Sequence, residues 1–253
     1  MTSGKERIIF PLDVASLEEA ESYVETLKDA VGLFKVGLEL FIAAGPQVVA
    51  AIRRQSAAGV FLDLKLHDIP ATVSRAMVRV ADLGVTMATV HCGENKAMLE
   101  AAVEGGQGRV TLLGVTVLTS VSADDVVQAG FQEAYAADLG ALVMKRAAMA
   151  EAAGFSGVVC SGLEAARIKQ AFGAGFLTVT PGIRPEWENA NHGDQKRVLT
   201  PAQAIREGAD YLVIGRPIRD ADDPHQAAFK IAEEIESGAS STVTVGQDEH
   251  QRT

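Results

Sequence analysis

Short apolar runs alternate with longer helical patterns along most of the chain. Eight of these runs are rich in Val, Ile or Leu and apolar on both faces, which is typical of parallel strands covered by helices. Eight strand–helix units in 253 residues predict an α/β fold, a single (β/α)8 TIM barrel, with an open doubly wound sheet as the alternative. The expected strands span residues 8–14, 33–38, 60–66, 87–92, 112–118, 157–161, 176–181 and 211–215.

The predicted helices have recognisable starts. Ser16 followed by Glu19 fits a capping box, in which each side chain accepts a backbone N–H at the other end of the first turn. Pro46, Pro70 and Pro201 each suit a first helical position, where the missing N–H costs nothing.

Two segments do not fit the repeating unit. Residues 183–199 form a long polar stretch after the seventh strand, a length typical of lids and binding loops. We expect the catalytic barrel to occupy residues 1–237. Residues 238–253 are polar and poor in large apolar side chains, so we expect a disordered C-terminal tail.

The third expected strand alternates apolar and charged residues. Phe61, Asp63 and Lys65 share one face, because successive side chains of a strand point to opposite sides, and the three leucines between and after them share the other. Burying such charges costs several kcal/mol each unless they are paired. The strand end therefore indicates either a functional site or a structural Asp–Lys ion pair.

Charged residues also occur at the ends of the first two strands. Asp13 ends the first strand and Lys35 lies on the second, beside Asp63 and Lys65 on the third. The carboxyl ends of barrel strands converge on one face, where the active sites of such folds are built. These four residues predict a ring of alternating charge, which is harder to explain as a structural ion pair than a single pair would be.

The composition limits the classes of partner. The formal net charge is −10 and the pI is near 5.0, which argues against a general nucleic-acid binder. No apolar run approaches the roughly 18 residues of a membrane span, and residues 1–7 carry no apolar export signal. Cys92 and Cys160 lie in apolar runs, as reduced core cysteines do. We therefore expect a cytoplasmic protein that binds neither nucleic acid nor membrane.

The run that contains Asp63, Lys65 and Asp68 resembles the Asp-x-Lys-x-x-Asp signature of the orotidine 5′-phosphate decarboxylase family. The segment 91–95 departs from the family pattern, in which a small residue and paired glycines follow the histidine. Further motifs occur in the order expected of bacterial members: Leu12-Asp13, Phe34-Lys35-Val36-Gly37, Thr180-Pro181-Gly182-Ile183-Arg184, Asp194-Gln195 and Ile214-Gly215-Arg216.

The resemblance implies decarboxylation of orotidine 5′-monophosphate to uridine 5′-monophosphate without a metal or other cofactor. Lys65 would stabilise a carbanion at C6 of the ring and then protonate it. Asp63 would lie near the departing carboxylate, and Lys35 would meet the ribose hydroxyls together with Asp13.

The resemblance also implies a homodimer with shared active sites, because Asp68 and Thr72 of family members reach into the neighbouring subunit's site. Gly215 and Arg216 would hold the phosphate, as loops seven and eight do in many barrels. A surface arginine and a solvated loop glutamine are the alternative interpretations of Arg216 and Gln195. The remaining expected substrate contacts are Thr119, Pro181, Arg184 and Gln195.

Two other functions stay open. Sugar-phosphate decarboxylases and synthases of the same barrel group carry a similar motif but use magnesium, with a carboxylate at the end of the second strand. Lys35 occupies that position here, and an ammonium repels a divalent cation. A non-catalytic phosphoribosyl-binding barrel is the second alternative, although such a protein would not need Lys65 facing Asp63.

Overall fold

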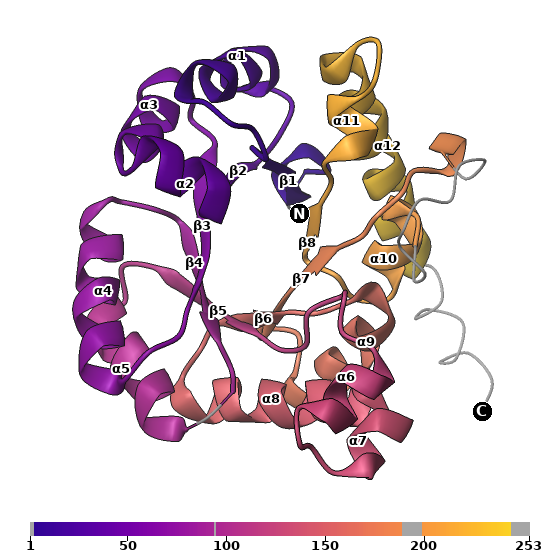
Figure 1. Cartoon of the computed structure of the whole chain (residues 1–253). Helices are drawn as coiled ribbons and strands as arrows, with labels where there is room; N and C mark the ends of the chain where they lie inside the picture. The colour runs from indigo at the N-terminus through magenta and orange to yellow at the C-terminus, as the bar shows by residue number, and fades with distance from the viewer. Residues whose placement is uncertain (1–2, 94, 189–198, 244–253) are drawn as a thin grey trace, which may run out of the picture.

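The computed structural model describes residues 3–93, 95–188 and 199–243. Within them, eight parallel strands pair in sequence order and close into a barrel, with β1 bonded to β8 (Figure 1). The predicted (β/α)8 barrel is therefore confirmed, and the open sheet is excluded. The strands are β1 Ile8–Pro11, β2 Leu33–Gly37, β3 Gly59–Leu66, β4 Met87–His91, β5 Thr111–Val115, β6 Gly157–Val159, β7 Leu177–Pro181 and β8 Tyr211–Val213.

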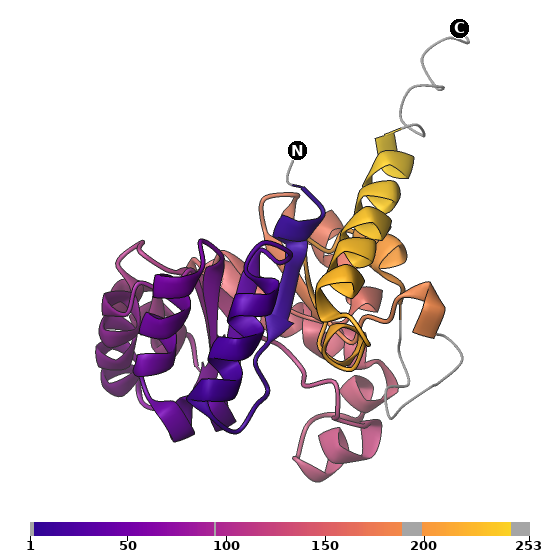
Figure 2. The same ribbon diagram turned by 90° about the horizontal axis from the view of Figure 1, so that it is seen from above.

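Helices surround the barrel (Figure 1). The pair α6–α7 is inserted between β5 and α8, on the opposite side of the barrel from the N-terminus (Figure 2). The helices are η1 Lys5–Arg7, α1 Leu17–Leu27, α2 Leu38–Ala44, α3 Gln47–Gln55, α4 Pro70–Asp82, α5 Lys96–Gly106, α6 Ala123–Gln128, α7 Glu133–Ala137, α8 Leu139–Ala153, α9 Gly162–Phe172, η2 Glu186–Glu188, α10 Pro201–Arg206, α11 Arg216–Arg219 and α12 Pro224–Val243.

The helix starts follow the sequence signals in most cases. The Ser16 hydroxyl accepts the Glu19 N–H at 3.2 Å, and Pro70 and Pro201 are the first residues of α4 and α10. The prediction for Pro46 was wrong by one residue, because Pro46 is the N-cap of α3 and Gln47 is its first residue.

The inside and outside of the barrel are two separate apolar layers. Strand residues that point outward pack beneath the helices, as Ile8 and Phe10 of β1 do. The inward-pointing residues Ile9, Leu33, Phe61, Met87, Leu113 and Val179 form a smaller cluster that fills the barrel interior. Lys35 and Asp63 each come two residues after a member of this cluster, so they point inward one layer nearer the carboxyl ends of the strands. The packed interior thus lies directly beneath these two charged residues.

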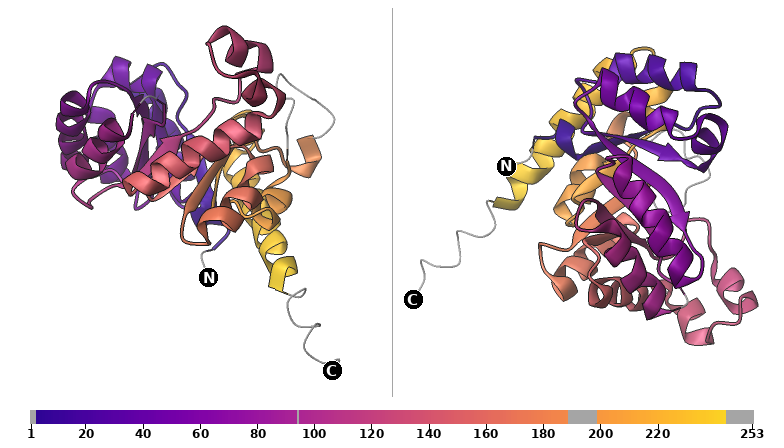
Figure 3. Two further views of the ribbon diagram at one scale, coloured as in Figure 1. Left: turned by 90° about the horizontal axis from the view of Figure 1, so that it is seen from below. Right: turned by 90° about the vertical axis from the view of Figure 1, so that its left-hand side faces the viewer.

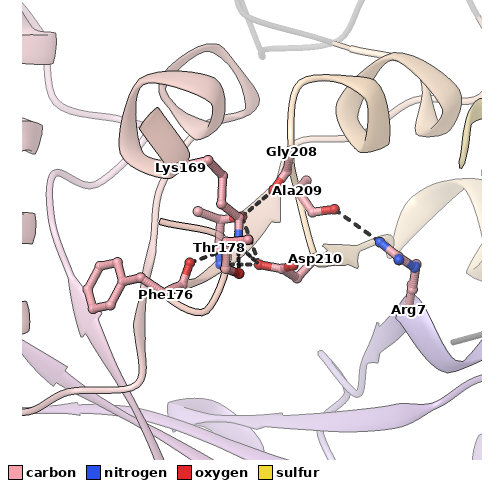
Figure 4. Close-up of polar contacts among 8 residues, drawn as sticks. Arg7, Lys169, Phe176, Thr178, Gly208, Ala209 and Asp210 are labelled. Atoms are coloured by element: carbon pink, nitrogen blue, oxygen red, sulfur yellow. Dashed lines mark hydrogen bonds and ion pairs between the residues drawn. The ribbon is translucent and has the colours of Figure 1, made fainter. Parts of the chain in front are cut away.

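A polar network lies at the amino ends of β7 and β8 (Figure 4). The Asp210 carboxylate, just before β8, accepts a hydrogen bond from Lys169 at 2.6 Å and one from the Thr178 N–H at 2.8 Å. The Thr178 hydroxyl, which is fully buried, donates to the Gly208 carbonyl at 2.8 Å. These bonds satisfy polar groups between α9, β7 and β8 and have a structural role.

The C-terminal helix extends further than the sequence indicated. We expected a disordered tail from residue 238, but α12 continues to Val243, projecting from the barrel beside the N-terminus (Figure 3). Gly238 lies against α10, where an added Cβ would come 2.7 Å from the Ala202 Cα. The lack of a large side chain at Gly238, which contributed to the prediction of a tail, allows this close packing of two helices. Residues 244–253 of the expected tail lie outside the described residues.

No helix in the described part of the chain is long and apolar enough to cross a membrane.

Candidate active site

A bulge in β3 shapes the centre of the site. Leu62 pairs with Ala88 of β4 and Leu66 pairs with Val90, so three residues of β3 lie opposite Thr89 alone. Such bulges re-aim side chains and are frequent beside active sites. The leucines of β3 still pack on the outer apolar layer, which confirms the predicted division of the two faces.

The four residues of the predicted ring come together in one chain of contacts. The Lys35 ammonium lies 2.9 Å from Asp13 Oδ1 and 3.9 Å from Asp63 Oδ2. The Lys65 ammonium lies 2.8 Å from the same Asp63 oxygen. Signs therefore alternate along Asp13, Lys35, Asp63 and Lys65, and each charge has an opposite neighbour.

The two middle residues of the ring, Lys35 and Asp63, are its most enclosed members. The side chains of Lys35 and Asp63 are 12% and 13% exposed, whereas those of Lys65 and Asp13 are 29% and 56% exposed. Gly37 leaves space beside the ring, because a Cβ there would lie 3.2 Å from the Lys35 ammonium. In such a partly dry environment, paired charges interact more strongly than they would in water. A ligand that entered from the open side would meet Lys65 first among the two lysines.

Lys65 itself has a left-handed backbone, with φ of +52°. This conformation costs a non-glycine residue about 1–2 kcal/mol. The Lys65 N–H donates to the Thr89 hydroxyl at 2.9 Å, and that hydroxyl donates to Asp63 Oδ1 at 2.9 Å. Thr89 was not singled out from the sequence. The only signal was its polar character within the otherwise apolar strand β4, two residues before His91.

Asp68 and Thr72 lie at the rim, away from these contacts. Asp68 is exposed, and its carboxylate accepts the N–H of the following Ile69 at 2.6 Å. Thr72 is half-buried in the first turn of α4. Thr119 is exposed in the segment between β5 and α6, on the same face of the barrel.

Positive charge gathers at the ends of β7 and β8. The Arg219 guanidinium donates to both carboxylate oxygens of Asp220, at 2.6 and 3.2 Å, and lowers the pKa of Asp220. The charges of Arg216 and Arg184 lower this pKa further, which places both guanidinium groups near the same carboxylate. Asp220 and Glu188, which lies 3.6 Å from the Arg184 Nε, offset part of this charge. In a protein with a net charge of −10, the remaining local excess of positive charge suits an anion.

The backbone around these arginines is tightly packed. Gly215 is the N-cap of α11, and an added Cβ there would come 2.9 Å from the Pro11 ring of β1. Pro181 ends β7 and pairs with Val213 of β8. Arg184 donates to the Ile183 carbonyl at 3.1 Å. Gln195, the expected partner from the long loop, lies outside the described residues.

Three described residues of the unusual segment 91–95 make local structural contacts. Asn95 caps α5 by accepting the Met98 N–H at 2.8 Å. The His91 and His67 rings lie 5.7 Å apart at the ends of β4 and β3. Cys92 packs against Gly114, where any side chain would overlap its sulfur. The departure from the family pattern therefore leaves the strand end well packed.

Neither cysteine offers a nucleophile. Cys92 and Cys160 are both buried free thiols, which confirms their predicted place in the core. Burial raises the pKa of the Cys92 thiol to about 12 and also raises that of Cys160. Among the described residues, no group of three or more His, Cys, Asp or Glu side chains is arranged to hold a metal ion.

Comparison with protein families gives a match along most of the chain. The model of the family described as "Orotidine 5′-phosphate decarboxylase / HUMPS family" matches residues 6–231. The chain is 54% identical over 233 residues to the orotidine 5′-phosphate decarboxylase of Desulfosudis oleivorans, covering 92% of this chain and 94% of that protein. It is 46% identical over 240 residues to the enzyme of the same name from Pelobacter propionicus, covering 93% and 97%.

Solved structures give the same result. The crystal structure of orotidine 5′-phosphate decarboxylase from Lactobacillus acidophilus is 34% identical, with a TM-score of 0.76, and covers 90% of this chain and 98% of that one. An uncharacterised conserved protein from Geobacillus kaustophilus is 35% identical, with a TM-score of 0.74, covering 90% and 99%.

The buried thiols generate a prediction about reactivity. A thiol reacts as its thiolate, and at pH 8 a pKa of about 12 leaves a thiolate fraction of only about 10⁻⁴ for Cys92. We expect neither cysteine to react with a chromogenic disulfide reagent at pH 8 in the native protein, and both to react after unfolding in urea. Prompt labelling of one thiol per native chain would contradict this.

Proposed function

The chain belongs to the orotidine 5′-phosphate decarboxylase / HUMPS family, and we propose that it converts orotidine 5′-monophosphate to uridine 5′-monophosphate with Lys65 as the proton donor. The single observation that carries the proposed chemistry is the Asp13–Lys35–Asp63–Lys65 ring at the carboxyl ends of β1 to β3. It holds the partly exposed Lys65 ammonium next to the mostly buried Asp63 carboxylate.

The chemistry of the reaction explains why such an ammonium is required. When the bond between C6 and the carboxylate breaks, its electron pair stays on C6 as a localised carbanion and carbon dioxide leaves. The Lys65 ammonium stabilises the developing negative charge and then transfers a proton to C6. The neutral Lys65 amine regains its proton from solvent before the next turnover.

Asp63 and Lys35 would prepare the site for this step. The Asp63 carboxylate accepts a hydrogen bond from the Lys65 ammonium at 2.8 Å. This bond would orient the proton donor, and it would place Asp63 close to the carboxylate of the bound substrate. The repulsion between the two carboxylates falls as carbon dioxide forms, a contribution that favours the transition state over the bound substrate. Lys35, between the two acids, would meet the ribose hydroxyls together with Asp13.

The same ring disfavours a magnesium-dependent sugar-phosphate enzyme. Lys35 lies between Asp13 and Asp63 at 2.9 and 3.9 Å, so a divalent cation bound to these carboxylates would have to displace an ammonium. The naming of both curated relatives as orotidine 5′-phosphate decarboxylases supports the same choice. We propose that the reaction needs neither a metal nor another cofactor.

The phosphate of the substrate would bind at the ends of β7 and β8. Arg216 can add a charge-assisted bidentate contact, with Gly215 allowing the backbone to approach β1 closely. Arg184 and Pro181 frame the root of the loop from which Gln195 would close over the anion. Thr119 would face the polar edge of the pyrimidine from the β5 side.

We propose that the active protein is a homodimer with shared sites. Leu38 and Ile42 of α2 are 51% and 80% exposed, and Ile69 after β3 is 65% exposed. These apolar side chains follow the carboxyl ends of two paired strands, and a second copy of the chain would cover them. Asp68 and Thr72 lie beside them, which suits a role in the neighbouring subunit's site.

The reduced thiols Cys92 and Cys160 support the further proposal that the protein acts in the cytoplasm, which imaging of a fluorescent fusion in the source cell would test.

The first prediction tests Lys65 directly. Lys65→Ala should lower kcat for orotidine 5′-monophosphate, followed by its ultraviolet absorbance, by about a thousandfold or more, because one electrostatic donor at the developing charge contributes roughly 10² to 10³ and the proton donor is lost as well. Lys28→Ala, which removes an exposed lysine paired with Glu25, is the matched control and should keep full activity. A folded Lys65→Ala protein with more than about a tenth of wild-type activity (~1.4 kcal/mol) would refute the role of Lys65.

The same assay distinguishes the alternatives. Turnover of the wild-type protein should survive extensive treatment with a chelator. Activity that disappears with the chelator and returns with magnesium would favour the sugar-phosphate enzymes. Binding of the substrate without any turnover would favour a phosphoribosyl-binding protein.

The shared site predicts complementation between two inactive proteins. When Lys65→Ala and Asp68→Asn subunits exchange, each heterodimer should contain one site with both defects and one with neither. An equal mixture with random exchange should regain about a quarter of wild-type activity. If subunit exchange is verified by mass and no activity returns, Asp68 acts within its own subunit or has only a structural role.

The phosphate site predicts an effect that depends on the substrate. Arg216→Ala should lower kcat/KM for orotidine 5′-monophosphate by roughly tenfold to a hundredfold, since it removes a charged hydrogen-bond donor, and should hardly affect the slow reaction of the nucleoside orotidine. Added phosphite should stimulate the wild-type enzyme on the nucleoside more than it stimulates Arg216→Ala. Equal losses on both substrates would assign Arg216 to the fold or to the pyrimidine end of the site.

A further inference from the structure

We infer that Thr89 is a positioning residue for the proposed decarboxylation, and that its hydroxyl holds Lys65 in the backbone conformation which presents the ammonium to the substrate. The inference rests on the proposed function of the site. Thr89 is only 1% exposed, points into the barrel from β4, and lies next to the bulge of β3. Thr89 would act through its hydrogen bonds to Lys65 and Asp63, without touching the reacting atoms.

The direction of both bonds is determined by chemistry. The Lys65 backbone N–H can only donate, and the ionised Asp63 carboxylate can only accept. The Thr89 hydroxyl can do both: it accepts the Lys65 N–H and donates to the Asp63 carboxylate, at 2.9 Å each. One atom thus joins the backbone of the proposed proton donor to the carboxylate that holds its ammonium.

The bulge explains why a special support is needed here. A regular β3 would bond its backbone to β4 along its whole length, but the register shift interrupts the ladder between Leu62 and Leu66. Within this interval Lys65 adopts φ of +52°, which opposes the ordinary preference of a residue with a side chain. A side-chain hydroxyl replaces the missing backbone partner for the Lys65 N–H, and it offsets part of the cost of the conformation.

The alternative is that Thr89 only fills the barrel interior, and the identity of its two partners argues against this. Thr178 of β7 is also buried, and at the opposite end of the barrel its hydroxyl contacts the Gly208 carbonyl at 2.8 Å and Asp210 Oδ2 at 3.2 Å. The two threonines are therefore similar in burial and bonding, but only Thr89 touches Asp63 and Lys65. They form a matched pair for separating stability from positioning.

The experiment compares Thr89→Val, Thr89→Ser and Thr178→Val in the full-length protein. Thr89→Val keeps the shape but removes the hydroxyl, and it should lower kcat on orotidine 5′-monophosphate by about tenfold to a hundredfold. The Kd for the product, uridine 5′-monophosphate, should change by less than about threefold, because positioning of the proton donor affects the chemical step. Thr89→Ser restores the hydroxyl and should keep kcat within about threefold of wild type. Thr178→Val should lower Tm and leave kcat unchanged.

A crystal structure of Thr89→Val supplies a measurement that does not depend on activity. We expect Lys65 to leave the left-handed region or its ammonium to move away from Asp63. If wild-type protein fails to decarboxylate the substrate, the proposed function is wrong, and the position of Lys65 in this variant still decides the role of Thr89. If the valine variant does not fold, Thr89→Cys, with its weak S–H donor, should be slower than Thr89→Ser.

Three results would overturn the inference. They are a folded Thr89→Val protein with wild-type kcat and an unmoved Lys65, a Thr89→Ser protein as slow as Thr89→Val, and a loss of kcat in Thr178→Val equal to that in Thr89→Val.

Discussion

The interaction on which the site depends is the sharing of the Asp63 carboxylate between two ammonium groups. Lys65 contacts one carboxylate oxygen at 2.8 Å and Lys35 approaches the same oxygen at 3.9 Å. Removing either cation would leave a mostly buried carboxylate with less compensation, and an uncompensated buried charge is strongly destabilising. Each charge in the ring therefore keeps its neighbours in place, and the ring is a single electrostatic unit.

The barrel provides the geometry that such a unit requires. The inner apolar cluster fills the lower part of the barrel. Lys35, Asp63 and Lys65 are held above it on the adjacent strands β2 and β3, and Asp13 lies two residues past the end of β1. A rigid scaffold of this kind aligns dipoles and charges before the substrate arrives, which lowers the reorganisation needed during the reaction. At the other end, the network around Asp210 lies at the amino ends of β7 and β8 and uses a different set of charges.

The sequence was most informative where charged residues interrupt the regular apolar pattern of a strand. Eight apolar runs were sufficient to predict the barrel, and alternation along β3 placed Asp63 and Lys65 on the inner face. The bulge and the left-handed Lys65 could not be read in this way, because a register shift depends on the neighbouring strand. Thr89 was missed for the same reason, since its partners are distant in sequence. The start of the tail was misjudged because a segment poor in large apolar side chains can still be helical, with Gly238 packed closely against α10.

Under the proposed mechanism, the left-handed backbone of Lys65 sets stability and activity against each other at one residue. Glycine would adopt φ of +52° without strain. Replacing Lys65 by glycine would therefore remove the strain, but it would also remove the ammonium that the proposed reaction needs. The protein retains a local cost of about 1–2 kcal/mol, a noticeable share of the free energy that keeps a domain folded. Favourable interactions in the rest of the barrel must therefore offset this local cost for the protein to stay folded.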